Sequence, residues 1–480
     1  MIESPIVFLS ACLAFVFGSP ASVAQTNVDV TEYVESRTAL TASVSQELWN
    51  LAELGYLETR SSELLQNVLK GEDFTLRSGV ADIPTAFVAS YGRGGPVIAI
   101  LAEFDALPGI NQDATAERSP VEGKNAGHAC GHNLFGAGSI TAALAIKDWL
   151  QKTGTPGTIR LYGTPAEEGG SGKVYMVRAG LFDDVDIAMH WHASDENSAA
   201  ARTTLANRSA KFRFYGTSAH AAGAPDKARS ALDGVEAFNY MVNLMREHIP
   251  QESRIHYVIT SGGLAPNVVP DFAEVFYYVR NPEARLVSDI WRRVEDAARG
   301  AARGTGTRVE WEIIHGNHPL LVIETLAEMM DEKLRLVGGV EYNQAEQQFA
   351  ETLYASLTEP DLPLGSEQDI QPYSVSLGYG STDVGDVSIA VPTVGLRTAT
   401  WVPGTSAHTW QAVAASGMSI GHKGASNAAK VLSLAAVELY TNPALRQRAK
   451  DEHAFRLGDN FEYEALLGDR DPPLDFRVSK

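Results

Sequence analysis

The sequence predicts a layered α/β domain that is interrupted by a smaller inserted domain of the ferredoxin-like α+β type. Apolar strands alternate with helical segments before residue 207, and helices and a strand return after residue 315. The segment between them follows the order β-α-β-β-α-β over about 110 residues, which is typical of the ferredoxin-like fold. We therefore expect the first domain at residues 27–206 and 316–480, and the inserted domain at residues 207–315.

The discontinuous domain begins with a helical pattern. Residues 30–70 carry apolar side chains at three- and four-residue spacing. Residues 96–101 are wholly apolar and predict a strand buried on both faces, in a sheet covered by helices. The other expected elements of this domain are strands at residues 85–91, 157–163, 186–192 and 390–396, and helices at residues 136–150 and 321–336. Residues 359–372 form the one loop-like stretch inside it.

The inserted domain begins with a strand at residues 209–215, where apolar and polar side chains alternate. Glycines and a proline, Gly262, Gly263 and Pro266, separate its second and third strands. The remaining expected elements are helices at residues 228–248 and 284–303 and strands at residues 254–260, 273–280 and 308–314.

The composition is that of a globular protein, with 44% hydrophobic and 20% charged residues among 480. Lysine and arginine total 39 against 59 acidic residues, so the formal net charge is 39 − 59 = −20. This balance argues against a nucleic acid or an anionic membrane surface as the main partner. Two cysteines cannot form a disulfide framework.

The amino terminus predicts a cleaved signal peptide at residues 1–24, and hence a secreted or periplasmic protein. An uncharged apolar run at residues 6–17 is too short to span a bilayer comfortably, and Ser22-Val23-Ala24 suits a signal peptidase. No lysine or arginine precedes the run. A lipoprotein signal at Cys12, an uncleaved anchor and a cytoplasmic protein with a misassigned start are the alternatives.

Two clusters combine ligand-type side chains. Residues 127–133 (GHACGHN) place Cys130 and His132 two apart, so in an extended loop both can converge on one ion. Glu167 and Glu168 follow the strand at residues 157–163 in a glycine-rich loop. Adjacent carboxylates project in different directions, so one can bind a metal while the other holds a proton. A buried cysteine with incidental histidines and a solvated acidic pair are the alternatives.

Histidines occur in three further places. His190 and His192 share one face of the strand at residues 186–192, His408 stands in a loop-like context, and His220 follows the first strand of the inserted domain. Core or turn histidines are the alternative interpretation. A thiolate, several histidines and two carboxylates exceed the ligands of one ion, so the set suggests two ions about 3.5–4 Å apart. Cysteine and histidine favour zinc, although a carboxylate-rich site could accept manganese.

Seven motifs give the chain its resemblance to a known family. They are EFDALPG (Glu103–Gly109), GHACGHN (Gly127–Asn133), GTPAEEGG (Gly163–Gly170), GTSAHAAGAP (Gly216–Pro225), NVVPD (Asn267–Asp271), GSTDVGDVS (Gly380–Ser388) and PGTSAHTW (Pro403–Trp410). With them the sequence resembles the aminoacylase and carboxypeptidase-G type dinuclear metallopeptidases. Within that family it is most similar to the amidohydrolases that act on aminobenzoyl-glutamate, hippurate and indole-acetyl amino acids.

The resemblance implies two divalent ions per chain, zinc or manganese. It implies five metal ligands, namely Cys130, His132, Glu168, His192 and His408. It also implies Glu167 as the general base and Asp105 as a residue that orients the ligands. Cys130 stands where relatives place a bridging aspartate. Members of the family differ over which histidine of the strand binds, so His190 remains the alternative to His192.

The resemblance further implies that the inserted domain pairs two subunits and contributes to substrate binding. His220, Asn267 and Arg280 match positions that contact substrate in relatives, where the histidine reaches the partner's site. A homodimer is therefore expected, and a second homologous subunit remains open. The implied function is metal-dependent hydrolysis of the amide bond of an N-acyl amino acid, with an aminobenzoyl-glutamate-like substrate among the candidates.

Three other functions compete with this one. A dipeptidase or carboxypeptidase on the same scaffold differs only in its substrates. A thiol hydrolase would use Cys130 with His128 or His132. A binding protein without catalysis is disfavoured by the Glu167–Glu168 pair, because a loop carboxylate beside a metal has no evident packing role.

Overall fold

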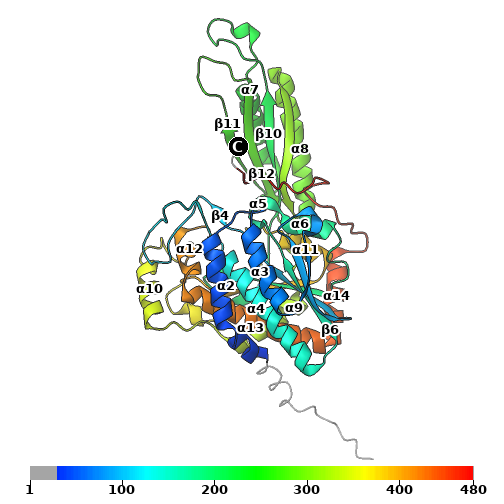
Figure 1. Ribbon diagram of the computed structural model, residues 1–480. Coiled ribbons are helices and arrows are strands. Elements are labelled where there is room, and N and C mark those ends of the chain that lie inside the picture. The colour runs from blue at the N-terminus through cyan, green and yellow to red at the C-terminus, as the bar shows by residue number, and fades with distance from the viewer. Residues whose placement is uncertain (1–29, 200, 479–480) are drawn as a thin grey trace, which may run out of the picture.

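The structure is a computed structural model that describes residues 30–199 and 201–478. The expected leader at residues 1–24 lies outside the described residues. Figure 1 shows a broad body of helices around a sheet, with a narrow domain projecting from its upper side. The layered α/β body and the inserted α+β domain confirm the predicted fold class. In the described part of the chain, no helix has the length and hydrophobicity needed to cross a bilayer.

The body is built on a mixed sheet of seven strands in the order β1-β2-β6-β3-β7-β15-β8. Its inner strands β6, β3, β7 and β15 run parallel, and the outer strands β1, β2 and β8 are antiparallel to their neighbours. The strands are β1 Thr75–Ser78, β2 Phe87–Arg93, β3 Val97–Ala102, β6 Gly157–Gly163, β7 Ile187–Ser194, β8 Ser198–Ala199 and β15 Thr393–Ala399. Residues 98–102 of β3 are fully buried, as their wholly apolar sequence predicts.

Helices cover this sheet, and α4 (His132–Thr153) packs directly on it. A side-chain carbon at Gly138 would lie 2.8 Å from the Trp191 ring, so only glycine allows this close approach. The other helices of the body are α2 Thr38–Leu51, α3 Thr59–Gly71, α5 Glu167–Gly170, α6 Gly172–Arg178, α9 Glu324–Val337, α10 Gln344–Tyr354, α11 Val384–Ala390, α12 Trp410–Ser416, α13 Ser419–Thr441 and α14 Pro443–Leu457. Short strand pairs join β4 Leu107–Pro108 to β5 Ala126–Gly127 and β9 Arg202–Thr203 to β14 Ser376–Leu377.

The helical stretch expected at residues 30–70 is divided. Residues 30–35, α2 and α3 are helical, and the chain turns away between α2 and α3. Ala52 and Tyr56 have positive φ angles of 43° and 67° there. A side-chain carbon at Gly55 would lie 3.0 Å from Ala166, so this turn approaches the loop that precedes Glu167. Apolar spacing alone does not reveal such a turn.

The inserted domain has the predicted order of elements. Its antiparallel sheet has the order β11-β12-β10-β13, and α7 and α8 pack on one face. The elements are β10 Ala206–Tyr215, α7 Ala231–Met245, β11 Arg254–Ser261, β12 Phe272–Asn281, α8 Ala284–Thr305 and β13 Arg308–Asn317. Phe212 and Tyr277 are buried on the helical face, whereas Lys211, Tyr278 and Arg280 point to the other face. That second face lines a cavity over the body.

Candidate metal centre and catalytic site

The predicted ligands lie where several strands of the body end. Glu167 and Glu168 follow β6, His192 lies on β7, and Cys130 and His132 stand at the start of α4. His408 follows β15, in the loop before α12. Because β6, β7 and β15 belong to the parallel part of the sheet, their carboxyl ends meet at one edge. This arrangement brings residues that are far apart in sequence into one cluster.

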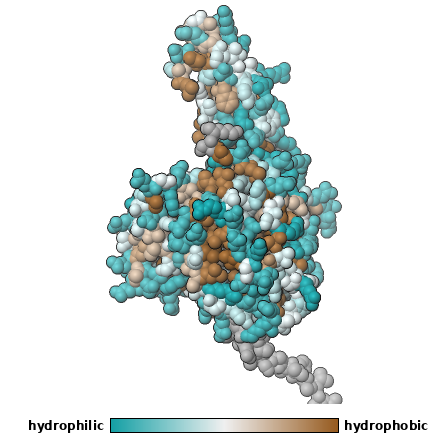
Figure 2. Space-filling view, in the orientation of Figure 1, coloured by the Kyte–Doolittle hydropathy of each residue, from teal (hydrophilic) through white to brown (hydrophobic). Residues whose placement is uncertain are grey.

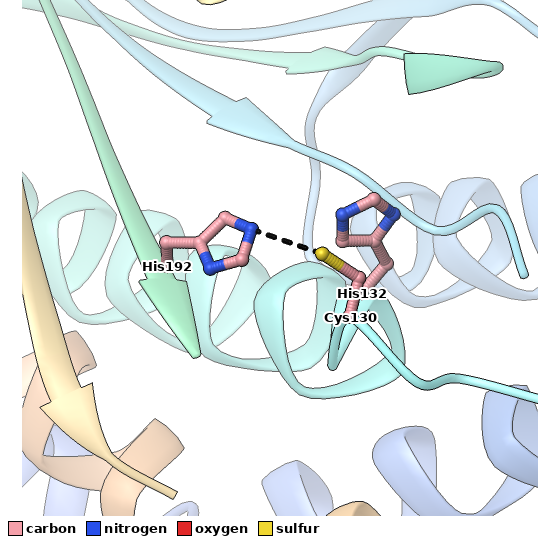
Figure 3. A group of neighbouring side chains, drawn as sticks. All are labelled: Cys130, His132 and His192. Atoms are coloured by element: carbon pink, nitrogen blue, oxygen red, sulfur yellow. Dashed lines mark hydrogen bonds between the residues drawn. The ribbon is translucent and has the colours of Figure 1, made fainter. Parts of the chain in front are cut away.

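Two groups of side chains in the described residues share Cys130. In the first, Cys130, His132 and His192 place one ligand atom each within 4.8 Å of one another. Figure 3 shows these three side chains converging, and the Cys130 Sγ lies 3.5 Å from His192 Nε2. In the second group, Cys130 is joined by Glu168 and His408, whose Nε2 lies 3.4 Å from the Glu168 Oε1. The thiolate is therefore positioned between two sets of ligands.

A third group consists of Glu103, His132 and Glu167. Glu103 Oε2 lies 3.0 Å from His132 Nε2, and both side chains are buried. The EFDALPG motif contains Glu103, but this residue was not predicted to belong to the site. Its position after the buried strand β3, in line with the other strand-end ligands, is the signal that would have found it.

The donor atoms fit divalent cations. The His132 Nε2, the Glu168 Oε1 and the Glu103 Oε2 are buried, and their contacts with one another and with His408 lack hydrogen-bond geometry. A cation would satisfy these atoms, and sulfur, nitrogen and carboxylate donors together suit zinc. Although burial alone raises the pKa of the Cys130 thiol, His192 and His132 bring this pKa well below its usual range. The cysteine is thus prepared to act as a thiolate.

Asp105 contacts two of the predicted ligands. Its Oδ1 accepts a hydrogen bond from His132 Nδ1 at 2.9 Å, and its Oδ2 accepts one from the backbone N–H of Glu168, also at 2.9 Å. Burial opposes the charge of Asp105, but His132 lowers its pKa below the usual value. A carboxylate that fixes the tautomer of a ligating histidine typically orients it toward the metal.

Glu167 lies in the same cavity as Cys130 and His192. Burial first, and then the nearby carboxylates of Glu103 and Glu168, raise the pKa of Glu167 well above its usual value. A carboxyl group with a raised pKa can accept a proton and pass it on near neutral pH. Its position beside the ligands and this pKa are what a general base requires.

The two histidines of β7 have different surroundings. His192 belongs to the ligand group, and its Nδ1 lies 2.7 Å from the carbonyl oxygen of Ala193. His190 is buried against Gly395, where an added side-chain carbon would lie 2.2 Å from its ring. Burial lowers the pKa of His190 to about 3, and it belongs to none of the ligand groups of the described residues.

A cavity of about 1250 Å³ lies between the body and the inserted domain. Cys130, Glu167, Glu168, His192 and His408 line it from the body, and Arg280 lines it from β12. The structure thus brings Arg280 to the site.

His220 and Asn267 lie elsewhere. Both are exposed, in loops of the inserted domain, and neither lines the described cavity. The His220 Nδ1 accepts hydrogen bonds from the backbone N–H groups of Ala222 and Gly223 at 3.2 and 3.1 Å. One chain therefore does not bring these two residues to its own ligand cluster.

A buried lysine behind the cluster was not expected from the sequence. The Lys173 Nζ lies 2.6 Å from Glu103 Oε1 and 2.7 Å from Asp383 Oδ1, and all three side chains are almost fully buried. Asp383 also accepts a hydrogen bond from the backbone N–H of Lys173. The GSTDVGDVS motif contains Asp383, whereas a lone lysine in α6 carries no sequence signal of burial.

The chain is similar over most of its length to curated hydrolases. One of the p-aminobenzoyl-glutamate hydrolase subunits of Escherichia coli (strain K12) is 39% identical over 88% of this chain and 94% of its own length. The Xaa-Arg dipeptidase of Mus musculus is 29% identical over 89% of this chain and 91% of its own length.

Solved structures share the fold. An aminobenzoyl-glutamate utilization protein from Klebsiella pneumoniae superimposes with a TM-score of 0.58 at 18% identity, over 84% of this chain and 97% of that one. A dinuclear metal binding peptidase of the M20 family from Bacillus subtilis gives a TM-score of 0.56 at 18% identity, over 84% and 99%.

The fold, the ligand cluster and these relatives define a hydrolase of amide bonds. The sequence model of peptidase family M20/M25/M40 matches residues 99–357, more than half of the chain. The chain belongs to this family.

Proposed function

We propose that the protein hydrolyses the amide bond of N-acyl amino acids, including substrates similar to aminobenzoyl-glutamate, with two divalent ions per chain. The observation that carries this proposal is the pair of ligand groups sharing Cys130, beside Glu167 in one cavity. Their sulfur and nitrogen donors favour zinc, and their carboxylates are compatible with manganese. The curated relative at 39% identity supports the acyl-glutamate class of substrate.

The residues of the site have distinct tasks in this reaction. Bound ions would supply Lewis-acid polarisation of the scissile carbonyl and of the attacking water. Glu167 removes a proton from that water and delivers it to the leaving amine, for which its raised pKa is suited. Arg280 faces the same cavity and binds a substrate carboxylate through its guanidinium group.

A dipeptidase is the second candidate, supported by the similarity to the mouse Xaa-Arg dipeptidase. The two candidates differ in the group on the carbonyl side of the scissile amide bond, which is an acyl group in one and an aminoacyl group in the other. A panel of N-acyl amino acids and dipeptides with shared carboxy-terminal residues separates them.

Glu167→Gln tests the mechanism. The variant should lose about 10²–10⁴-fold in turnover, because the amide cannot accept a proton, while its metal content stays at the wild-type level. Glu332→Gln on the exposed face of α9 is a control with the same chemical change. Near-wild-type turnover in a metal-loaded Glu167→Gln protein would remove Glu167 from this role.

We also propose that two chains form a homodimer through the inserted domain. Strand β11 is an edge of its sheet, and Val258 on it is 56% exposed. On α7, Tyr240 and Leu244 are 67% and 56% exposed. Figure 2 shows such apolar residues on the otherwise largely hydrophilic inserted domain. An apolar edge strand beside an apolar helix face suits a self-complementary two-fold interface.

The dimer would give His220 a task in the partner's cavity, since it does not line its own. There it could donate a hydrogen bond to the oxyanion, and losing one such donor typically costs about 10²–10³-fold in turnover. Asn267, in the adjoining loop, would also contact substrate in the partner's cavity.

Mixing His220→Ala and Glu167→Gln proteins tests this proposal. In each mixed dimer one site carries both changes and the other carries neither. Half of the dimers are mixed after random exchange of equal amounts, so about one quarter of all sites become intact. Mass analysis confirms that mixed dimers have formed. If mixed dimers show no recovery of activity, His220 does not act across the interface.

An assembly with a second, homologous chain is the alternative. This chain is also 30% identical over 233 residues to the other p-aminobenzoyl-glutamate hydrolase subunit of Escherichia coli (strain K12). Full activity of the purified single chain would exclude a requirement for such a partner.

A further inference from the structure

The last twenty described residues run from the body to the cavity. After α14 ends at Leu457, the segment 459–478 forms neither helix nor strand, and Figure 1 shows it reaching the inserted domain. On the way Leu467 packs in the core of the body, and Leu466 packs in the core of the inserted domain. Arg470 then pairs with Glu312 of β13 at 3.1 Å. The segment is thus attached to both domains before it reaches the site.

Its end packs against the loop that carries Glu168. The Arg477 Nη2 donates a hydrogen bond to the backbone carbonyl of Glu168 at 2.5 Å. The Phe476 ring meets Tyr56 edge-on at 5.7 Å, and the Tyr56 hydroxyl donates to the carbonyl of Gly170 at 2.5 Å. Within the segment, Pro473, Asp475, Phe476, Arg477 and Val478 line the cavity. The carboxy-terminal segment is therefore one wall of the proposed active site.

This wall adds a second guanidinium group beside Arg280. Among the described residues, the Nε atoms of Arg280 and Arg477 are buried without a hydrogen-bond partner, while the Arg477 Nη2 donates to the Glu168 carbonyl. Arg213 lines the same cavity but is engaged by Glu274 and Glu312 at 2.7 and 3.0 Å. Both side chains are partly buried and line the cavity, and the unpaired part of each guanidinium group can bind an anionic group of a ligand.

Tyr278 connects the two arginines in space. The guanidinium of Arg280 lies over its ring at 5.4 Å. An added side-chain carbon at Gly169 would lie 3.9 Å from Arg477 Nη2 and 4.0 Å from the Tyr278 hydroxyl. The Arg477 group therefore lies next to the metal-ligand loop and on the same side of the cavity as Tyr278. A guanidinium group binds a carboxylate through two parallel hydrogen bonds, and lysine cannot reproduce this geometry.

We propose that Arg477 is a specificity-determining residue that binds a second carboxylate of the substrate, while Arg280 binds the first. The inference rests on the proposed function, because the substrate would be an N-acyl amino acid with an acidic side chain, such as an acyl-glutamate or acyl-aspartate. The segment 473–478 then selects dicarboxylic substrates over neutral ones of the same size.

The test compares N-benzoyl-glutamate with N-benzoyl-glutamine, which differ by one charge and have nearly the same shape. Arg477→Gln should lower kcat/KM for the glutamate substrate by about 10–100-fold, the usual range for a hydrogen bond to a charged group, and change it less than about threefold for glutamine. Arg477→Lys should retain part of the preference, and a chain ending at Pro472 should lose it. Arg456→Gln on α14 removes the same charge from a surface ion pair with Glu324 and serves as the control.

Two further readouts separate substrate binding from support of the metal site. Arg477→Gln should keep wild-type metal content, whereas a residue that only holds Glu168 would lose metal and reduce kcat equally for both substrates. Calorimetry on the Glu167→Gln protein measures binding of N-benzoyl-glutamate without turnover. Adding Arg477→Gln should weaken this binding by the same factor of about 10–100 that is expected for kcat/KM.

The outcomes are distinct. Loss of discrimination between the two substrates supports the inference, and an equal effect on both, or none, overturns it. If the wild-type protein hydrolyses neither substrate but binds N-benzoyl-glutamate through Arg477, the proposed function fails and the carboxylate site stands. Absence of binding to the Glu167→Gln protein overturns the carboxylate site.

Discussion

Replacing Lys173 by methionine should destabilise the body strongly. The lysine and its two carboxylate partners, Glu103 and Asp383, are at most 1% exposed, with ion-pair distances of 2.6 and 2.7 Å. Methionine preserves most of the volume but leaves the buried Asp383 without its cation, and it leaves Glu103 with only the His132 contact at 3.0 Å. Removing one partner of a buried ion pair costs about 3–5 kcal/mol, and here two acids lose a contact with the same cation. We therefore expect a loss of unfolding free energy near the upper end of that range.

Urea unfolding followed by tryptophan fluorescence measures the loss. Lys430→Met is the matched control, because its Nζ lies 2.9 Å from Glu35, whose side chain is 60% exposed. An exposed pair contributes about 0–1 kcal/mol, so the control should unfold at nearly the wild-type midpoint. Adding Asp383→Asn to Lys173→Met should recover part of the stability, since one uncompensated charge is then removed. Equal midpoints for Lys173→Met and Lys430→Met would refute the reasoning.

Two other predictions concern the metal ligands and pH. Cys130→Ala should lower both metal content and activity, since Cys130 belongs to two ligand groups, whereas Cys130→Asp should retain part of each. Elemental analysis measures the metal content. Full activity after exhaustive chelation would contradict a metal site. Burial lowers the pKa of His315 to about 4, against about 6.5 in an unfolded chain. Below about pH 6.5 the unfolded chain therefore binds a proton that the folded protein does not. The free energy of unfolding falls by about 3 kcal/mol as the pH falls from about 6.5 towards 4. His315→Gln should accordingly reduce the decrease of the thermal midpoint over that range, and an unchanged decrease would exclude His315 as its source.

Local patterns were sufficient to predict the architecture. The wholly apolar run at residues 96–101 became the buried strand β3, and the alternating run at residues 209–215 lies within β10 of the inserted sheet. The order of the elements in the inserted domain followed from the same kind of signal, because strand and helix periods differ. The turn between α2 and α3 was missed. There Gly55 lies close to Ala166, a residue more than a hundred positions away, and apolar spacing gives no signal of such an approach.

The residues of the candidate site also fall into two kinds, those that short sequence motifs indicate and those that they do not. Cys130, His132, Glu167 and Glu168 stand in compact motifs, and the sequence alone predicts them as site residues. Lys173 was not found, because buried lysines are rare and nothing in the neighbouring residues indicates that two acids surround it. Glu103 was missed although it directly follows the buried strand β3. Arg477 and Tyr278 reach the site through tertiary packing, and a side chain's position relative to a distant loop has no periodic signature.

The attachment of the inserted domain has a mechanical consequence. The two chain crossings at its base, in β10 and β13, are hydrogen-bonded neighbours, with Asn207 opposite Asn317. The Asn317 Nδ2 in turn donates to the carbonyl of Thr382 in the body at 3.0 Å. Strand β12 continues the ladder at the same level, with Arg280 opposite Asn207, and the segment 459–478 packs in the cores of both domains, so more than two strands brace this base. Because Arg280 stands in the ladder of this base, any tilt of the domain that moved the distant His220 loop would leave Arg280 nearly fixed over the cavity.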